Sequence, residues 1–160
     1  MHWPDEAACE HFASLLAAGL ARQPALRDAC LELDGPLGAG KTTFVRHLLR
    51  ALGVSGRIKS PTYAVVEPYE LTLPDGRPLA VSHFDFYRFS DPREWADAGF
   101  REVYTAPGLK LAEWAEKAAP HLPAPDLRLT IAPQDDDSRQ VLAEACSPTG
   151  QRWLRAAEVA

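Results

Sequence analysis

The sequence contains little of what disulfide-rich secreted, zinc-binding or membrane-spanning proteins require. The three cysteines, Cys9, Cys30 and Cys146, are far apart, odd in number and without the C-x-x-C spacing of a zinc or redox site. The five histidines are scattered, and no pair has the spacing of metal ligands. The most apolar stretch, residues 12–21, is shorter than the roughly 20 residues that cross a bilayer. Because the amino terminus is acidic, unlike a signal or transit peptide, we expect a cytoplasmic protein with free thiols.

An excess of positive charge is also missing. The chain has 17 Lys and Arg against 22 Asp and Glu, a formal net charge of -5. A protein that grips a phosphodiester backbone on its own normally carries a basic run or face, and the sequence has no such run. We therefore expect no tight binding of nucleic acid by this chain alone. The length of 160 residues and the apolar content of 46% are ordinary for one globular domain, which we expect to span residues 1–160.

The predicted elements follow an order that is typical of an α/β protein. Apolar residues at helical spacing predict helices over residues 4–23 and 42–53, and a short apolar run predicts a central strand over 29–33. After residue 59 the chain is rich in Val, Tyr and Phe, which favours strands. These strands are expected at 60–71, 79–89, 107–114, 124–133 and 139–146, with turns at 72–78 and 134–138 and helices at 91–100 and 149–160. The two turns predict two hairpins, whose strands are antiparallel, whereas strands joined through helices are usually parallel. We therefore expect a three-layer α/β fold with a mixed parallel and antiparallel sheet.

The central strand leads directly into GPLGAGKT at residues 35–42, which matches the P-loop pattern G-x-x-x-x-G-K-S/T. Glycine permits backbone angles that side chains forbid, and it lets phosphate oxygens approach the amide N–H groups. The following helix adds its positive end, Lys41 adds a point charge for the terminal phosphates, and the Thr42 hydroxyl is a hard ligand suited to magnesium. We therefore predict a P-loop nucleoside triphosphatase fold. Nucleotide contacts are predicted at Gly35, Gly38, Ala39, Gly40, Lys41, Thr42 and Thr43.

Two acidic residues are candidates to complete such a site. Asp85 ends the run LAVSHFD, and Glu113 ends LKLAE. Ligands of open α/β sheets bind beyond the carboxyl ends of strands, so both positions suit a carboxylate near the metal. A surface salt bridge or a helix cap accounts for either acid equally well. Thr62, in the loop KSPTY, has a hydroxyl suited to sensing the terminal phosphate, although an ordinary turn is the more usual explanation of such a loop. Trp114, beside Glu113, is by itself more typical of a core.

The absence of asparagine helps to separate three classes of P-loop protein. Without asparagine, the chain contains no Asn-Lys-x-Asp motif, by which GTP-binding switch proteins read guanine. A small-molecule kinase usually has arginines gathered on a lid, whereas the arginines of this chain are spread along it. A nucleotide-gated binding module, in which hydrolysis is incidental, is kept as an alternative from another class. A nucleotide-driven partner protein needs only a P-loop, a metal carboxylate and surface segments that change with the nucleotide state. That third class fits best.

Longer stretches of the chain resemble the TsaE family, also called YjeE, of bacterial P-loop ATPases. The matching stretches are GPLGAGKTTF, KSPTYAVVEPY, HFDFYRFSDP, LAEWAEK and a late strand pair that contains Arg139. The P-loop alone is generic, but K-S-P-T, H-F-D-x-Y-R and E-W together, in the family's order, are specific. The resemblance implies a P-loop sheet of mixed direction and a role in forming N6-threonylcarbamoyladenosine in transfer RNA.

The same resemblance implies ligands, partners and residue roles. It implies that the protein binds ATP and Mg²⁺ and joins the TsaB and TsaD proteins, so that tRNA is contacted only through the complex. No arginine finger can be assigned, so we expect hydrolysis to be slow without these partners. The residues implied for catalysis are Lys41, Asp85 and Glu113, those for the metal are Thr42, Glu113 and Asp85, and the further functional residues are Trp114 and Thr62. Glu6, Ser138 and Arg139 are implied to border the nucleotide.

One position departs from the family pattern. The family usually has an acid directly after the first P-loop glycine, where this chain has Pro36. Proline removes a carboxylate and a backbone N–H. Because the later amides of the loop form most of the phosphate cradle, we expect ATP binding to survive. Any role of that acid in hydrolysis or docking is not carried over to this chain.

Overall fold

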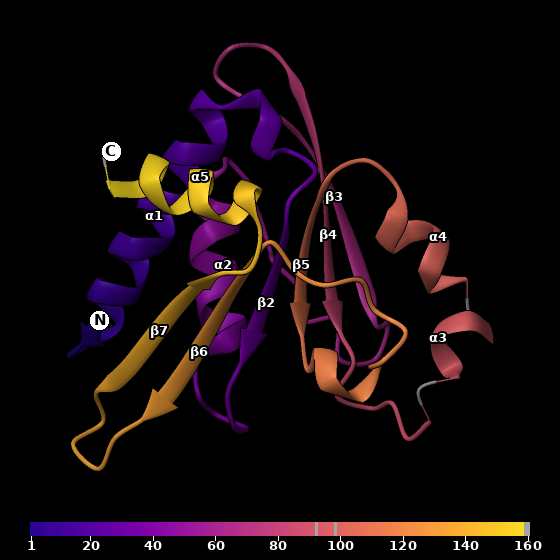
Figure 1. Cartoon of the computed structure of the whole chain (residues 1–160). Coiled ribbons are helices and arrows are strands. Elements are labelled where there is room, and N and C mark those ends of the chain that lie inside the picture. The colour runs from indigo at the N-terminus through magenta and orange to yellow at the C-terminus, as the bar shows by residue number, and fades with distance from the viewer. Residues whose placement is uncertain (92, 98, 159–160) are drawn as a thin grey trace.

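A seven-stranded sheet forms the centre of the computed structural model, which describes residues 1–91, 93–97 and 99–158 (Figure 1). The strands are β1 (His2–Trp3), β2 (Cys30–Asp34), β3 (Val66–Thr72), β4 (Pro78–Asp85), β5 (Leu109–Glu113), β6 (Leu127–Pro133) and β7 (Arg139–Ala145). Their order across the sheet is β1-β7-β6-β2-β5-β4-β3. The neighbours β6, β2, β5 and β4 are parallel, whereas the β3–β4, β6–β7 and β1–β7 pairs are antiparallel. The predicted mixed α/β sheet is therefore confirmed.

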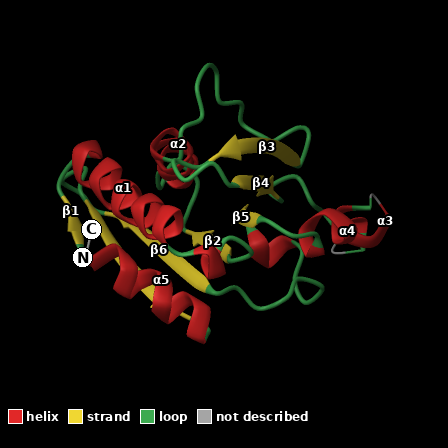
Figure 2. Cartoon of the chain, turned by 90° about the horizontal axis from the view of Figure 1, so that it is seen from above, coloured by secondary structure: helices red, strands yellow, loops and turns green. Residues whose placement is uncertain are grey.

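Helices lie on both sides of this sheet. They are α1 (Glu6–Arg22), α2 (Lys41–Ala51), α3 (Glu94–Asp97), α4 (Phe100–Thr105) and α5 (Pro148–Glu158), with 3₁₀ turns η1 (Pro24–Leu26) and η2 (Ala115–Lys117). Figure 2 shows α1 and α2 on one side of the sheet and α3 and α4 on the other. Asp5 caps α1, because its carboxylate accepts a hydrogen bond of 3.0 Å from the N–H of Ala8. Among the described residues, no helix is both long enough and apolar enough to span a bilayer.

Two hydrophobic clusters hold the layers together. In the larger one, Phe44 of α2 stacks on Trp3 of β1 with ring centroids 5.9 Å apart. In the same cluster, the buried Trp153 of α5 donates its indole N–H to the carbonyl of Leu16 at 3.0 Å. The smaller cluster is mainly aromatic and contains Phe84, Phe86, Phe89, Trp95 and Tyr104. Burying one such side chain stabilises the fold by about 1.5–3 kcal/mol, so the two clusters fix the central strands from both faces.

The structure adds one strand and shortens several others relative to the sequence prediction; the strand predicted over 79–89, for example, ends at Asp85. The two residues of β1 are too few to show a periodic pattern, yet Trp3 pairs with Arg139 at the edge of the sheet. The strand predicted over 60–71 begins only at Val66, because the residues before it form a turn. In that turn the backbone of Val65 has a φ of 68°, which is incompatible with an extended strand.

The single helix predicted over 91–100 is wrong. The described residues form two short helices, α3 and α4, and α4 continues to Thr105. Gly99 precedes α4 with a φ of 71°, a left-handed conformation that interrupts a right-handed helix. The predicted helix start at Asp91-Pro92 includes Pro92, which lies outside the described residues.

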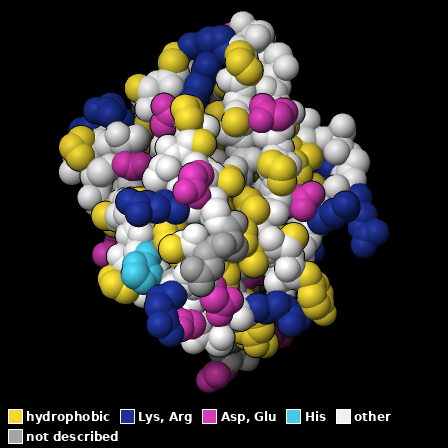
Figure 3. Space-filling model, turned by 90° about the vertical axis from the view of Figure 1, so that its right-hand side faces the viewer, with side chains coloured by type: hydrophobic (Ala, Val, Ile, Leu, Met, Phe, Trp, Pro, Cys, Tyr) yellow, Lys and Arg dark blue, Asp and Glu magenta, His cyan; other side chains and the backbone are white. Residues whose placement is uncertain are grey.

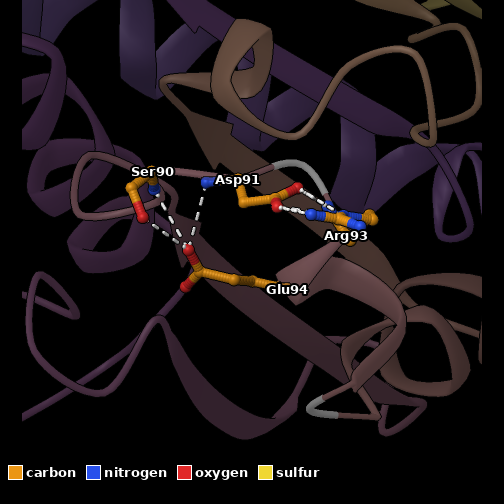
Figure 4. A network of polar contacts seen from close by, with 4 residues as sticks. All are labelled: Ser90, Asp91, Arg93 and Glu94. Atoms are coloured by element: carbon orange, nitrogen blue, oxygen red, sulfur yellow. Dashed lines mark hydrogen bonds and ion pairs between the residues drawn. The ribbon is translucent and has the colours of Figure 1, made fainter.

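A polar network fixes the chain in front of α3 (Figure 4). Oε1 of Glu94 accepts hydrogen bonds from the backbone N–H groups of Ser90 and Asp91, both at 3.1 Å, and from the Ser90 hydroxyl at 3.0 Å. Asp91 pairs with Arg93 at 2.6 Å, and this bonding lowers the pKa of Asp91 to about 2. The backbone N–H groups lower the pKa of Glu94 as well. The network therefore sets the path of the chain from β4 toward α3.

The carboxyl ends of three parallel strands meet at one edge of the sheet, the lower edge in Figure 1. There β2 leads through residues 35–40 into α2, while β4 ends at Asp85 and β5 at Glu113. The strand register places Asp85 beside Glu113, and Glu113 beside Leu33. Residues far apart in the sequence thus meet where the P-loop begins.

Candidate nucleotide-binding site

The P-loop has a backbone that only glycine adopts readily at its two ends. Gly35 has a φ of 147°, and a Cβ added there would lie 2.5 Å from the carbonyl oxygen of Ile131 in β6. Gly40 is the N-cap of α2, with a φ of 106° and no side-chain capping bond. The first N–H groups of α2 therefore have no side-chain acceptor from the cap and lie open to an anion, where the helix dipole also favours negative charge.

Lys41 is held inside the loop. Its ammonium donates hydrogen bonds to the carbonyl of Gly35 and, at 3.0 Å, to that of Pro36. It also lies 4.0 Å from the ring centroid of Trp114, within cation–π distance. Burial lowers the pKa of Lys41, and the negative charge of Glu113 opposes that shift. The lysine is thus held against the loop by its carbonyls and by an aromatic ring.

Pro36 fits this loop without disturbing it. Its carbonyl accepts hydrogen bonds both from Lys41 and, at 3.1 Å, from the N–H of Ala39. The proline is exposed, and the loop uses its carbonyl. The expectation that ATP binding survives this replacement remains a prediction.

Glu113 makes a hydrogen bond with each of its two carboxylate oxygens. Its Oε1 accepts a hydrogen bond from the Thr42 hydroxyl at 2.7 Å, and its Oε2 lies 2.6 Å from Nε2 of His83. The side chains of Glu113 and His83 are 2% and 0% exposed. Because an ionised carboxylate can only accept, the imidazole donates from Nε2. Both carboxylate oxygens are therefore fixed, one toward α2 and one toward β4.

His83 was missed by the sequence analysis. Nothing in its isolated position signals a site, but it stands two residues before Asp85 on the same strand. Side chains at i and i+2 of a strand point to the same face, so the H-x-D spacing contains a signal that both belong to one site.

Asp85 is held by the chain around it. Its Oδ1 accepts a hydrogen bond from the N–H of Tyr87 at 2.9 Å, and its Oδ2 accepts one from the Thr62 hydroxyl at 3.2 Å. The carboxylate is almost fully buried, and burial raises its pKa, with a further rise from the charge of Glu113. Thr62 therefore reaches the candidate site from its loop, as a sensing hydroxyl would.

One cleft of about 300 Å³ gathers most of the predicted residues. The lining consists of Leu37, Gly38, Ala39, Gly40, Lys41, Thr42, Thr43, Thr62, Asp85, Tyr87, Glu113 and Trp114. Tyr87 was not predicted, and its ring lies 5.1 Å from that of Trp114 between centroids. Gly35 stands behind this lining, where it shapes the loop.

The donor set of the cleft fits magnesium. Thr42, Glu113 and Asp85 supply hard oxygen atoms at adjacent positions, and magnesium takes few protein ligands alongside water and phosphate oxygens. The described residues contain no group of three or more His, Cys, Asp or Glu side chains that would hold a metal by themselves. A magnesium ion bound here would take its remaining ligands from water and from phosphate oxygens.

A second hollow, of about 160 Å³, borders the other side of the P-loop. Two of the three residues predicted to border the nucleotide, Glu6 and Arg139, line it together with Thr43. Arg139 also donates to the carbonyl of Ala39 at 3.0 Å, which ties β7 to the loop. Ser138 is not part of this lining, because its buried hydroxyl donates to Asp136 at 2.5 Å within the β6–β7 turn.

The fold and the site are those of a P-loop nucleotide-binding protein. They combine a helix N-terminus without a side-chain cap, a lysine enclosed by the loop, and a hydroxyl–carboxylate pair at the edge of a mixed sheet. Comparison with known proteins narrows this class. The family model for "Threonylcarbamoyl adenosine biosynthesis protein TsaE" matches residues 3–141. This chain belongs to the TsaE family.

Individual relatives agree with that assignment. The tRNA threonylcarbamoyladenosine biosynthesis protein TsaE of Haemophilus influenzae is 37% identical over 133 residues, which cover 83% of this chain and 81% of the relative. The protein of the same name from Streptomyces coelicolor is 34% identical over 125 residues, 78% of this chain and 82% of the relative. The crystal structure of Bacillus subtilis YdiB superposes with a TM-score of 0.76 at 25% identity, covering 99% of this chain and 93% of that one.

Proposed function

We propose that this protein binds ATP with Mg²⁺ and hydrolyses it in support of N6-threonylcarbamoyladenosine formation in tRNA, acting with TsaB and TsaD in the cytoplasm. The observation that supports it best is the meeting of Lys41, Thr42 and Glu113 at the open start of α2, with Asp85 beside them. The names of the relatives support the tRNA pathway.

Each polar group of the cleft has a part in this proposal. The N–H groups at the start of α2 bind phosphate oxygens, and Lys41 turns from the loop carbonyls to the terminal phosphates. Thr42 and Glu113 would hold the metal, with Asp85 beside it, and the bound metal would offset phosphate charge. His83 keeps the Glu113 carboxylate in place through its second oxygen.

Asp85 is assigned to the attacking water. Water attacks the γ-phosphorus, the bond from that phosphorus to the β–γ bridging oxygen breaks, and ADP and inorganic phosphate leave. Asp85 would accept a proton of the water through a carboxylate that the N–H of Tyr87 and the Thr62 hydroxyl hold in place. Thr62, bound to the same carboxylate, orients it.

The nucleotide part is tested by replacing Lys41. Lys41→Ala removes a charged hydrogen-bonding partner of the phosphates, each such bond being worth about 1.5–3 kcal/mol, so ATP affinity should fall about ten- to hundred-fold. Lys59→Ala is the matched control, because Lys59 is exposed and lies outside the cleft. Isothermal titration calorimetry with Mg·ATP measures both. Equal affinity of the two variants would contradict the assignment of the loop.

The hydrolytic part is tested by turnover. We expect slow ATP hydrolysis by the isolated chain and faster hydrolysis with TsaB and TsaD, since a transition-state arginine supplied by a partner is worth roughly 10³–10⁵ in rate. Fast turnover that the partners leave unchanged would refute this. Glu113→Ala separates hydrolysis from binding, because tRNA modification that continues through many turnovers without hydrolysis identifies a nucleotide-gated binding module. Transfer of phosphate from ATP to a metabolite would identify a small-molecule kinase.

A further inference from the structure

A hollow whose charged lining residues are all basic lies next to the nucleotide cleft. Charged side chains of both signs are interspersed over the face in Figure 3, and the whole chain carries a net charge of -5. The residues that line this hollow of about 610 Å³ nevertheless include four cations and no acid. The cations are Arg46, Arg57, Lys59 and Arg88, all exposed. We call this hollow the basic groove.

The basic groove also presents an aromatic ring. Tyr63 is 83% exposed, an unusual position for a large ring in a protein whose other aromatic residues are mostly buried. The guanidinium carbon of Arg88 lies 4.0 Å from the centroid of that ring. An exposed ring with a guanidinium against it is a platform on which a nucleobase stacks, while neighbouring cations neutralise phosphates.

This combination distinguishes between two kinds of anionic ligand. An acidic protein segment would pair with the four cations but would make no particular use of Tyr63. Unpaired RNA supplies both phosphates and a base face. We propose that the basic groove binds single-stranded RNA, with phosphates at Arg57 and Lys59 and one base on Tyr63. The inference rests on the proposed role in tRNA modification, and it replaces the expectation that RNA is contacted only through partners.

The proposal agrees with the acidic net charge of the chain. Four cations neutralise few phosphates, so binding by the isolated chain is weak and highly dependent on salt. The groove and the nucleotide cleft share Thr62, whose hydroxyl lies 2.8 Å from that of Ser60 and bonds to Asp85. RNA seated in the groove would therefore contact the loop that reaches the nucleotide site.

The test is fluorescence anisotropy with a fluorescein-labelled tRNA anticodon stem–loop and the full chain, at several salt concentrations. The Arg57→Glu/Lys59→Glu variant should lose about ten-fold or more in affinity, and the slope of log affinity against log salt should shrink by about 1.4 for two lost phosphates. Tyr63→Ala should lose about five-fold or more without changing that slope. The control Arg152→Glu/Arg155→Glu carries the same charge change on the exposed face of α5.

Three outcomes would overturn the inference. The first is that the wild type does not bind RNA at low salt. The second is that the groove variants and the α5 variant lose equal RNA affinity. The third is that fluorescein-labelled polyglutamate binds more tightly than RNA, which would identify a surface for acidic proteins. Mg·ATP affinity and thermal unfolding are measured on the same variants. Normal ATP binding with absent RNA binding refutes this inference alone, whereas absent ATP binding by the wild type refutes the proposed function.

Discussion

Replacement of Gly35 by alanine tests whether close packing against β6 shapes the phosphate-binding loop. The new Cβ would lie 2.5 Å from the carbonyl oxygen of Ile131 and 3.0 Å from Cβ of Ala39. Ile131 is part of the β6–β7 ladder, so its backbone cannot yield without loss of sheet hydrogen bonds. The P-loop must move instead.

Two costs add up at this position. The φ of 147° is unfavourable for any residue with a Cβ, at roughly 1–2 kcal/mol. Overlap in a packed environment adds about 1–3 kcal/mol. We therefore expect Gly35→Ala to lower the free energy of unfolding by about 2–5 kcal/mol, and the melting temperature by roughly 4–20 °C. Because the loop shifts, Mg·ATP affinity should fall as well.

The matched control is Gly76→Ala in the β3–β4 turn. Gly76 has a φ of 82°, but a Cβ there meets nothing within 4 Å, so this substitution carries the backbone cost alone. It should lower the free energy of unfolding by about 1–2 kcal/mol and leave ATP affinity unchanged. Urea denaturation and calorimetry compare the two variants. If Gly35→Ala is no less stable than Gly76→Ala and binds ATP normally, the packing argument fails.

Two further predictions follow from buried titratable groups. Burial raises the pKa of Asp85 above its ordinary 3.8, because the folded protein favours the protonated, uncharged carboxyl. The contribution of this group to folding stability is therefore complete below pH 3.8 and is lost as the pH rises through the pKa of the folded state. Asp85→Asn should therefore stabilise the protein without nucleotide at pH 7 by about 1 kcal/mol, while it weakens Mg·ATP hydrolysis. The variant should have a higher melting temperature than the wild type at pH 7, and this difference should shrink toward acidic pH. A difference that stays constant would contradict the prediction. Burial also raises the pKa of the Cys9 and Cys30 thiols to about 12, whereas Cys146 is exposed. Mass spectrometry after iodoacetamide treatment near pH 8 should find one label on the native protein and three after denaturation, and a second label on the native protein would refute the burial of these thiols.

Local sequence was sufficient to predict the central fold. Short stretches of sequence predict the strand over 29–33, the glycine loop and the helix over 42–53. The spacing of apolar residues indicates the strand and the helix, and the glycines with Lys41 form the P-loop pattern. The mixed sheet followed from two hairpin turns. The signals that predict these elements lie within short stretches of sequence, although the strands themselves pair with distant ones.

The rest depends on contacts between distant segments. The bond between His83 and Glu113 joins residues 30 positions apart, and no local pattern announces it. The basic groove is equally invisible, because Arg46, Lys59 and Arg88 come from three segments that only the fold brings together. The net charge of -5 describes the chain as a whole and does not show where cations gather on the surface, so it does not predict a basic groove.

Several polar groups of the site already have partners within the chain, and this constrains how ligand binding can release energy. Lys41 bonds to loop carbonyls, and Thr42 bonds to Glu113, which also contacts His83. Binding of Mg·ATP therefore exchanges hydrogen bonds at these residues, and such exchanges give a small net gain. A further gain comes from the charge of Lys41, which exchanges neutral carbonyls for phosphate oxygens, and from the N–H groups at the start of α2, which Gly40 leaves without a side-chain cap. Affinity would then depend on the backbone of the loop together with the charge of Lys41, and Thr42, Glu113 and Asp85 would determine what happens to the phosphate once it is bound.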